Sequence, residues 1–248
     1  MVRGPQSALW GSEALAGVIN VVTRRPTAGL QADAFLEGGA YGTLNGGAYA
    51  GGRAGRGYAS LSASRFDSDG NNAARGGEED DGYDNSTASL AAGFEFSPTL
   101  KFDASYRHTS TGKAYDVESL ATGLPADDAN GDGRDDVFHS DTRQDYLRLG
   151  AHWDTFAGRW NHQFRYGLTD TSIDTQAEDL YSAGTIDRTS QDGRKSTLSY
   201  QTSIGVTTDA PGNPADVLTL AIDHEREEFD QRGKVSSYDF DGDGIPDL

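Results

Sequence analysis

The sequence predicts an all-β fold, an antiparallel transmembrane β-barrel of which this chain supplies about nine strands. From Leu30 onward, apolar and polar residues alternate with the period of two that is typical of strands. After the first hairpin, short turns alternate with long polar loops, so all the long loops come out at one end of the sheet, as in bacterial membrane barrels. Aromatic residues near the predicted strand ends suit the level of lipid headgroups: they are Tyr58, Phe66, Phe96, Tyr106, Trp153, Trp160 and Tyr166.

The first three predicted strands are rich in small residues. The first, residues 30–37, alternates cleanly except at Phe35, which interrupts its polar face. A turn at Tyr41-Gly42 leads to a glycine-rich second strand, residues 43–53, and a tight turn at residues 54–57 leads to the third, residues 58–66. An acidic loop, residues 67–84, follows.

The next four strands form two predicted hairpins. The fourth and fifth, joined by Ser97-Pro98-Thr99, carry an apolar face made of Ala88, Leu90, Ala92, Phe94, Phe96, Leu100, Phe102, Ala104 and Tyr106. A loop over residues 111–141 precedes the sixth and seventh strands, which are joined at Phe156-Ala157-Gly158. Their apolar positions are Leu147, Leu149, Ala151, Trp153, Trp160, His162, Phe164, Tyr166 and Leu168.

The last two predicted strands follow another polar loop, residues 170–194. Leu198, Tyr200, Ile204 and Val206 mark the eighth strand, and a turn around residues 211–214 leads to the ninth, with Leu218, Leu220 and Ile222 on one face. We expect residues 230–248 to form a further acidic loop. Polar residues of the opposite face, including Lys101, Asp103, Arg107, Arg148 and Arg165, are expected to line a wet lumen.

Composition limits the function. A net charge of −18 argues against nucleic acid as a partner, because phosphate binding needs Lys and Arg in excess, and it favours cations. Cysteine is absent, which leaves no thiolate site or disulfide framework. The five histidines are scattered and form no known catalytic motif, so an enzyme is not expected. The longest apolar runs fall short of the roughly 18 to 20 residues that a spanning helix needs, whereas a barrel strand needs only about 9 to 11.

The N-terminal segment has a different pattern. It contains Arg3-Gly4-Pro5-Gln6-Ser7, then Trp10-Gly11-Ser12, and then the β-branched run Gly17-Val18-Ile19-Asn20-Val21-Val22-Thr23, which Arg24-Arg25-Pro26 ends. These motifs closely resemble the end of the plug domain of TonB-dependent outer-membrane receptors, where the chain passes into the barrel. The resemblance implies that residues 1–26 are the C-terminal end of a plug and that residues 27–248 are the N-terminal part of the barrel.

The same resemblance implies a location and a function. The chain is expected in the outer membrane of a Gram-negative bacterium, as a fragment of a transporter for energised uptake of a bulky, scarce ligand. Its partners would be outer-membrane lipid, a small-molecule ligand and the TonB energy-coupling complex, the last through a segment upstream of Met1. Within the family, the Gly-Pro-Gln-Ser-Ala-Leu-Trp-Gly-Ser stretch looks most like the cobalamin (vitamin B12) receptor branch. Ferric siderophore receptors are the near alternative.

Two loops carry the pattern D-x-[DN]-x-D-G-x-x-D, which places oxygen ligands at every second position and Gly at the sharp turn, as a hard cation such as calcium requires. The predicted ligands are Asp128, Asn130, Asp132 and Asp136 in one copy and Asp239, Asp241, Asp243 and Asp247 in the other. The bidentate Glu of an EF-hand is missing, so these motifs resemble the short calcium repeats of extracellular proteins. Asp80, Asp81 and Asp84 are further candidate contributors, and a metal-free acidic turn is the competing interpretation.

Two other classes of protein compete with the transporter. A secreted calcium-binding β-domain used for adhesion explains the acidity and both Asp-rich loops, but neither the N-terminal motifs nor the sorting of turns. A passive porin gives no reason for the N-terminal motifs. Dependence on detergent favours a membrane barrel, whereas a soluble domain that calcium stabilises against heat favours adhesion.

Overall fold

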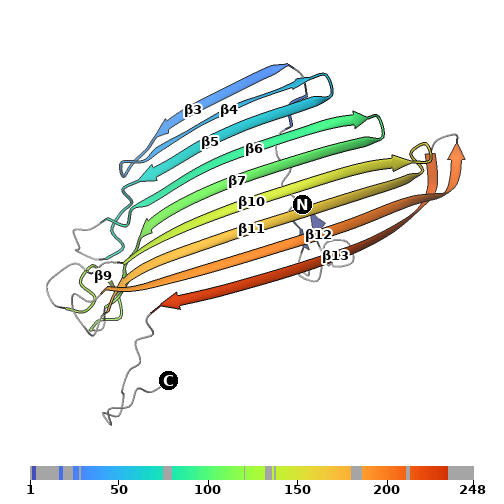
Figure 1. Cartoon of the computed structure of the whole chain (residues 1–248). Coiled ribbons are helices and arrows are strands. Elements are labelled where there is room, and N and C mark those ends of the chain that lie inside the picture. The colour runs from blue at the N-terminus through green and yellow to red at the C-terminus, as the bar shows by residue number, and fades with distance from the viewer. Residues whose placement is uncertain are drawn as a thin grey trace, which may run out of the picture.

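The structure is a computed structural model, and it describes residues 2–3, 17–18, 25–27, 29–74, 80–119, 121–131, 136, 138–179, 186–210 and 213–233. Its main body is one nine-stranded antiparallel sheet in which the strands lie side by side in chain order (Figure 1). The strands are β3 (Leu30–Gly38), β4 (Leu44–Ala54), β5 (Gly57–Ser68), β6 (Tyr83–Ser97), β7 (Leu100–Ala114), β10 (Phe138–Thr155), β11 (Trp160–Glu178), β12 (Ile186–Ala210) and β13 (Asn213–Gly233). The predicted all-β fold and its nine strands are confirmed.

Two small ladders accompany the sheet. Strand β1 (Val2–Arg3) pairs with β2 (Gly17–Val18) in the N-terminal segment. In the loop after β7, β8 (Val117–Glu118) pairs with β9 (Pro125–Ala126). Of the predicted strand at residues 18–23, the structure describes Val18, and the remaining residues lie outside the described part of the chain.

Short connections lie at one end of the sheet and longer ones at the other, as the sequence predicts. The turn at Phe156-Ala157 has positive φ at both residues, and so does the turn at Tyr41-Gly42. The loops are shorter than expected because the strands extend beyond their apolar residues. The predicted loop over residues 170–194 is wrong: β11 continues to Glu178, and β12 begins at Ile186. The predicted loop over residues 111–141 is likewise too long, because β7 continues to Ala114 and β10 begins at Phe138.

The two faces of the sheet differ in polarity. Residues that face each other across two strands lie on the same side, and Leu61, Leu90, Tyr106, Leu147 and Leu168 are linked in this way across five strands. Large side chains of this apolar face are 44% to 68% exposed, and the set includes Leu61, Leu90, Phe94, Phe102, Leu149, Trp153, Phe164, Leu198, Leu220 and Ile222. The opposite, polar face is composed mainly of Ser, Thr, Gln, Gly and charged residues.

Aromatic residues gather on the apolar face at the end with short connections. The ring of Trp160 lies 5.7 Å from that of Phe156 and 4.9 Å from that of His162, and the indole nitrogen of Trp160 donates to Thr202 Oγ1 at 2.6 Å. Trp153 and Trp160 lie near strand ends as predicted, whereas Tyr106 and Tyr166 lie within β7 and β11. Tyr58 and Phe66 also lie near the ends of their strand, but their cross-strand partners Gly93 and Asn85 place them on the polar face.

The apolar face ends along an oblique line. On one row of cross-strand partners, Ala63 and Ala88 of β5 and β6 lie level with Asp145, Asp170 and Arg194 of the later strands. Apolar residues therefore extend further toward the long loops on the early strands than on the late ones. Such a drift follows when the strands of a barrel tilt relative to the barrel axis.

The sheet buries little of its own surface. Among the described residues, the buried apolar side chains are Pro26, which is fully buried, and Ala129 and Phe138, which are 1% and 7% exposed and lie at the long-loop end. In this part of the chain, β3 pairs only with β4 and β13 only with β12, so both edges of the sheet are open. No helix among the described residues is long and apolar enough to cross a membrane.

Candidate functional site

The segment that leads into the sheet is seated on the polar face. Pro26 is fully buried, and the carboxylate of Asp103 on β7 lies 3.8 Å from the guanidinium of Arg25. The same guanidinium lies 6.0 Å from the ring centre of Tyr58 on β5. We call this seat, formed by Tyr49, Gly51, Tyr58, Ser60 and Asp103, the linker socket. It attaches the N-terminal segment to one wall of the sheet.

Glycines make room for the socket. A Cβ added to Gly51 would lie 2.6 Å from the Tyr49 hydroxyl, 2.8 Å from Ser60 Cβ and 3.0 Å from Pro26 Cγ. A similar close approach occurs at Gly93, where a Cβ would lie 2.3 Å from the ring of Tyr58. Gly in a strand interior often marks such a close approach. The glycine-rich composition of the early strands therefore serves side chains that lie flat across the polar face.

Phe35, which interrupts the predicted alternation, follows the same rule. A Cβ on Gly47 would lie 2.7 Å from Phe35 Cε1, so the Phe35 ring covers the backbone of the neighbouring strand. Covering of a strand glycine by an aromatic ring supports the local pairing. The apolar residue on the polar face is thus used for packing.

Charged residues of the polar face lie where the sequence predicts them. Lys101, Asp103 and Arg107 alternate on β7 with the apolar-face residues, and Arg148 and Arg165 do so on β10 and β11. The Arg53–Glu95 pair, at 2.6 Å, and the Lys195–Glu225 pair, at 2.8 Å, add to this set. Most of these charges are partly exposed.

The first candidate calcium loop is partly described. Asp136 is buried at 4% exposure, and one of its oxygens accepts the backbone N–H groups of Ala129 and Asn130 at 2.7 and 3.2 Å. Its other oxygen accepts the Asn130 side-chain nitrogen at 2.8 Å, and Asp128 accepts the N–H of Gly131 at 2.6 Å. Asp128, Asn130 and Asp136 are therefore brought together in one turn. Asp132, and with it Asp239, Asp241, Asp243 and Asp247 of the second copy, lies outside the described residues.

The loop that carries this turn contacts the loop before β6. The side-chain nitrogen of Asn72 donates to both carboxylate oxygens of Asp127, at 3.0 and 2.8 Å. Asp81, a candidate contributor, accepts the N–H of Ala73 at 2.8 Å. Asp116 Oδ2 is buried and has no hydrogen-bond partner among the residues that the structure describes. Acidic residues of two adjacent loops thus come together at the long-loop end.

Burial raises the pKa of two of these loop carboxyls. Burial, and then the charges of Asp81 and Asp127, raise the pKa of Asp116 against the backbone hydrogen bond from Ala74. Burial likewise raises the pKa of Asp136, against the two backbone N–H groups that favour its ionised form. Within the described part of the chain, no group of three or more acidic or histidine side chains is arranged to hold a metal ion.

Two solved structures share this architecture. The ferripyoverdine receptor of the outer membrane of Pseudomonas aeruginosa, bound to ferripyoverdine, matches with a TM-score of 0.71 at 10% sequence identity, over 96% of this chain and 33% of that chain. The sheet has the fold of part of an outer-membrane receptor barrel. The ferric yersiniabactin uptake receptor FyuA from Yersinia pestis matches with a TM-score of 0.63 at 17% identity, over 94% of this chain and 37% of that chain.

The chain spans about a third of the length of these two receptors. No protein-family model and no curated protein matches its sequence. The linker socket was not predicted from the sequence, although glycines inside a strand such as β4 are a signal of close approach. The strand positions of charged residues beyond the apolar face, such as Asp170 and Arg194, were not predicted either, because their polar surroundings are typical of a loop.

Proposed function

We propose that this chain is part of a TonB-dependent outer-membrane transporter, with the apolar face toward lipid and the polar face toward the lumen. The observation that carries the proposal is the concentration of large, exposed apolar side chains on a single face of a sheet with almost no core of its own. Such a face would aggregate in water, whereas lipid covers it at no cost. The N-terminal motifs and the two receptor structures support the same conclusion.

The domain division belongs to this proposal. Residues 1–26 would be the end of a plug, and residues 27–248 would form barrel wall. Seating of Arg25 and Pro26 on the lumen-facing side supports it, because a chain that passes from a plug into a barrel has to leave along the inner wall. Coupling to the TonB complex would depend on sequence that precedes this segment in the receptor.

For the ligand we propose a ferric siderophore. The two receptors compared above are named for such ligands, ferripyoverdine in one and ferric yersiniabactin in the other. Cobalamin, which the resemblance of the Gly-Pro-Gln-Ser-Ala-Leu-Trp-Gly-Ser stretch to cobalamin receptors suggests, is the second candidate. Ligand contacts are expected from the polar face and the loops at its long-loop end.

Calcium binding by the Asp-rich loops remains part of the proposal. The position of Asp128, Asn130 and Asp136 in one turn, with Asp116 and Asp127 close by, supports it. The hydrogen bonds that Asp128 and Asp136 already accept within the turn support the competing, metal-free interpretation. Calorimetric titration of the whole receptor with calcium distinguishes the two.

Uptake by intact cells tests the transport proposal. Cells with and without the gene would be grown under iron limitation and supplied with ⁵⁵Fe-labelled siderophores or ⁵⁷Co-labelled cobalamin. Loss of the gene should abolish uptake of one siderophore and leave uptake of cobalamin unchanged. Loss of cobalamin uptake alone would select the second candidate. Unchanged uptake of all ligands, or recovery of the protein from the soluble fraction, would contradict the proposal.

A further inference from the structure

Three exposed arginines are neighbours on the polar face. Arg107, Arg148 and Arg165 lie on the adjacent strands β7, β10 and β11. The cross-strand partner of Arg107 is Tyr146, which lies two positions before Arg148. The partner of Arg148 is Gly167, which lies two positions after Arg165. Each arginine is therefore the diagonal neighbour of the next, and diagonal neighbours are about 7–8 Å apart, within reach of long side chains. We call these three residues the arginine diagonal.

No ion pair between described residues includes a member of the arginine diagonal. The ion pairs on the polar face are Arg25–Asp103, Arg53–Glu95, His152–Asp154, Lys195–Glu225 and Lys195–Glu227. Asp103 is diagonal to Arg148, but its ion-pair partner is Arg25, at 3.8 Å. Arg165 donates to the amide oxygen of Gln163 at 2.5 Å, which leaves its charge in place. Like charges on neighbouring strands destabilise a sheet, so an anion beside them would stabilise all three.

Hydroxyl groups and open space surround the arginine diagonal. Cross-strand partners of its members include Ser89, Ser105 and Ser199. Beside Arg148, a Cβ on Gly167 would meet nothing within 4 Å, so there is room for a ligand next to the guanidinium groups. From the diagonal toward the long loops, the next polar-face residues of the three strands are uncharged, and they include Thr109, Thr111, Thr142, Gln144, Thr169 and Thr171.

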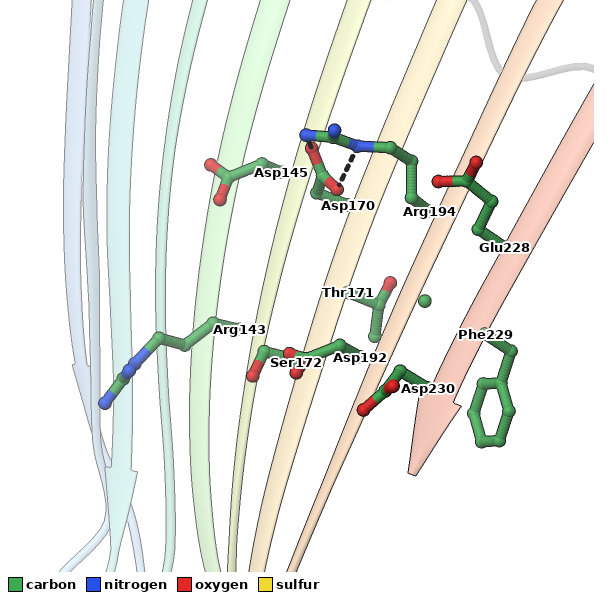
Figure 2. A pocket seen from close by; sticks show the side chains of 11 residues that line it. Arg143, Asp145, Asp170, Thr171, Ser172, Asp192, Arg194, Glu228, Phe229 and Asp230 are labelled. Carbon is green, nitrogen blue, oxygen red and sulfur yellow. Dashed lines mark hydrogen bonds and ion pairs between the residues drawn. The ribbon is translucent and has the colours of Figure 1, made fainter. Parts of the chain in front are cut away.

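The opposite face carries mainly negative charge at its long-loop end. Arg194 donates two hydrogen bonds of 2.9 Å to Asp170 there, and Asp145 and Glu228 lie on either side of this pair (Figure 2). Arg65 of the same face is likewise paired, with Asp67 at 2.7 Å. The net charge of the whole chain is −18. A group of arginines without carboxylate partners on the polar face therefore runs against the overall composition and indicates a specific role.

We propose that the arginine diagonal contacts a negatively charged ferric siderophore as it passes through the lumen. Such a ligand is an iron(III) complex whose catecholate or carboxylate oxygens leave it with net negative charge. Guanidinium groups donate strong, charge-assisted hydrogen bonds to oxygens of this kind, and serine hydroxyls supply further donors. A wall that is uncharged near the long loops and positive further inside attracts an anion inward. The inference rests on the proposed function and deepens it by naming the charge of the ligand.

Uptake of iron complexes that differ in charge tests this inference. Cells with and without the gene for the whole receptor would be given ⁵⁵Fe as anionic catecholate and citrate complexes and as uncharged trihydroxamate complexes. Uptake that depends on the gene should be limited to an anionic complex. The variant Arg107→Gln/Arg148→Gln/Arg165→Gln should lower the initial rate of this uptake roughly tenfold, since charge-assisted contacts are lost. Replacement of the same three residues by Lys retains the charges and should preserve most of the rate.

A matched control lies on one of the same strands. Arg143→Gln removes an exposed arginine of β10 from the opposite face, so the rate of uptake should be unchanged. The amount of each receptor in the outer membrane, and its resistance to unfolding by heat in detergent, verify that the variants are folded.

The possible outcomes separate this inference from the proposed function. Uptake of cobalamin or of an uncharged complex through the receptor would overturn the inference and leave transport intact. So would a native rate of uptake in the folded triple glutamine variant. Entry of a large antibiotic through that variant would also overturn it, because the arginines would then serve to hold the plug. Unchanged uptake of every complex after loss of the gene would instead contradict the proposed function itself.

Discussion

At the scale of single residues, Gly51 decides whether the linker socket can hold Pro26. Replacement by Ala places a methyl group within 3.0 Å of side chains on both neighbouring segments, so they have to shift. Overpacking of this kind costs about 1–3 kcal/mol. We expect Gly51→Ala to lower the free energy of unfolding of the whole receptor by this amount in a urea titration in lipid vesicles.

Gly167 provides the matched control for this prediction. It also lies in a strand of the sheet, on β11, and a Cβ there would meet nothing within 4 Å. Gly167→Ala should therefore leave the free energy of unfolding nearly unchanged. If the two variants behave alike, the socket does not constrain Gly51.

Asp136 sets the pH dependence of the loop after β7. Because its pKa is raised, the folded loop holds the carboxyl proton more tightly than the unfolded loop does. This contribution to loop stability is fully present below the pKa that Asp136 has in the unfolded chain. It is lost as the pH increases from that value through the raised pKa of the folded loop. Without calcium, hydrogen exchange of the Ala129 and Asn130 amides, corrected for intrinsic rates, should show less protection at pH 7 than at pH 4.

Two comparisons test the cause of that pH dependence. In Asp136→Asn the carboxyl is gone, so the change in protection between pH 4 and pH 7 should become smaller. Calcium added at pH 7 should restore protection in the native loop if the loop binds it. Greater protection at pH 7 than at pH 4 without calcium would refute the assigned role of Asp136.

At the scale of elements, a charged residue should destabilise the receptor on the apolar face of β5 but not on its polar face. Leu61 is 56% exposed on the apolar face, and Ser62 lies next to it on the polar face. An arginine on the lipid side of a barrel near the bilayer midplane costs about 2–4 kcal/mol, whereas lumen positions tolerate charge. Leu61→Arg should therefore destabilise the receptor by that amount, as measured by urea titration in vesicles.

Ser62→Arg supplies the comparison, because it introduces the same side chain one residue away. Its free energy of unfolding should remain close to that of the native receptor. A similar loss in both variants would mean that β5 does not separate lipid from water.

Alternation of apolar and polar residues could predict the strands within the apolar belt but not their full lengths. Leu147 to Trp153 and Trp160 to Leu168 were recognised because one face of each is apolar. Beyond Leu168, both faces of β11 carry polar residues such as Asp170 and Thr171, so the period of two disappears from the sequence although the backbone pairing continues. For the same reason, the charged residues of this part of the sheet, such as Asp170 and Arg194, could not be distinguished from loop residues.

The candidate site could be predicted only where the pattern is local. The turn formed by Asp128, Asn130 and Asp136 lies within nine residues, and the Asn130 side chain donates a hydrogen bond to Asp136 there. Calcium binding by this turn stays a prediction. The linker socket joins Arg25 and Pro26 to residues of β4, β5 and β7, which are distant in the sequence. Such contacts depend on register and on the path of the chain across the sheet, neither of which appears in a local motif.

At the scale of the whole molecule, the described sheet has two open edges. Strands β3 and β13 each pair on one side only in the part that the structure describes, and a large plugged barrel has about 22 strands. Residues 1–248 by themselves should therefore fail to form a closed barrel. Refolding in detergent followed by electrophoresis without boiling should give no compact, heat-resistant species. Appearance of such a species would show that these strands close by themselves.

The central claim is that one face of this sheet contacts lipid and the other lines the lumen. The sequence contains no cysteine, so single cysteines can be introduced without a background. Cysteines at positions 147–151 of β10 in the whole receptor would be labelled with an environment-sensitive fluorophore and exposed to brominated lipid. The account predicts strong quenching at Leu147, Leu149 and Ala151 and weak quenching at Arg148 and Gly150. Equal quenching at all five positions, or stronger quenching at Arg148 and Gly150, would contradict it.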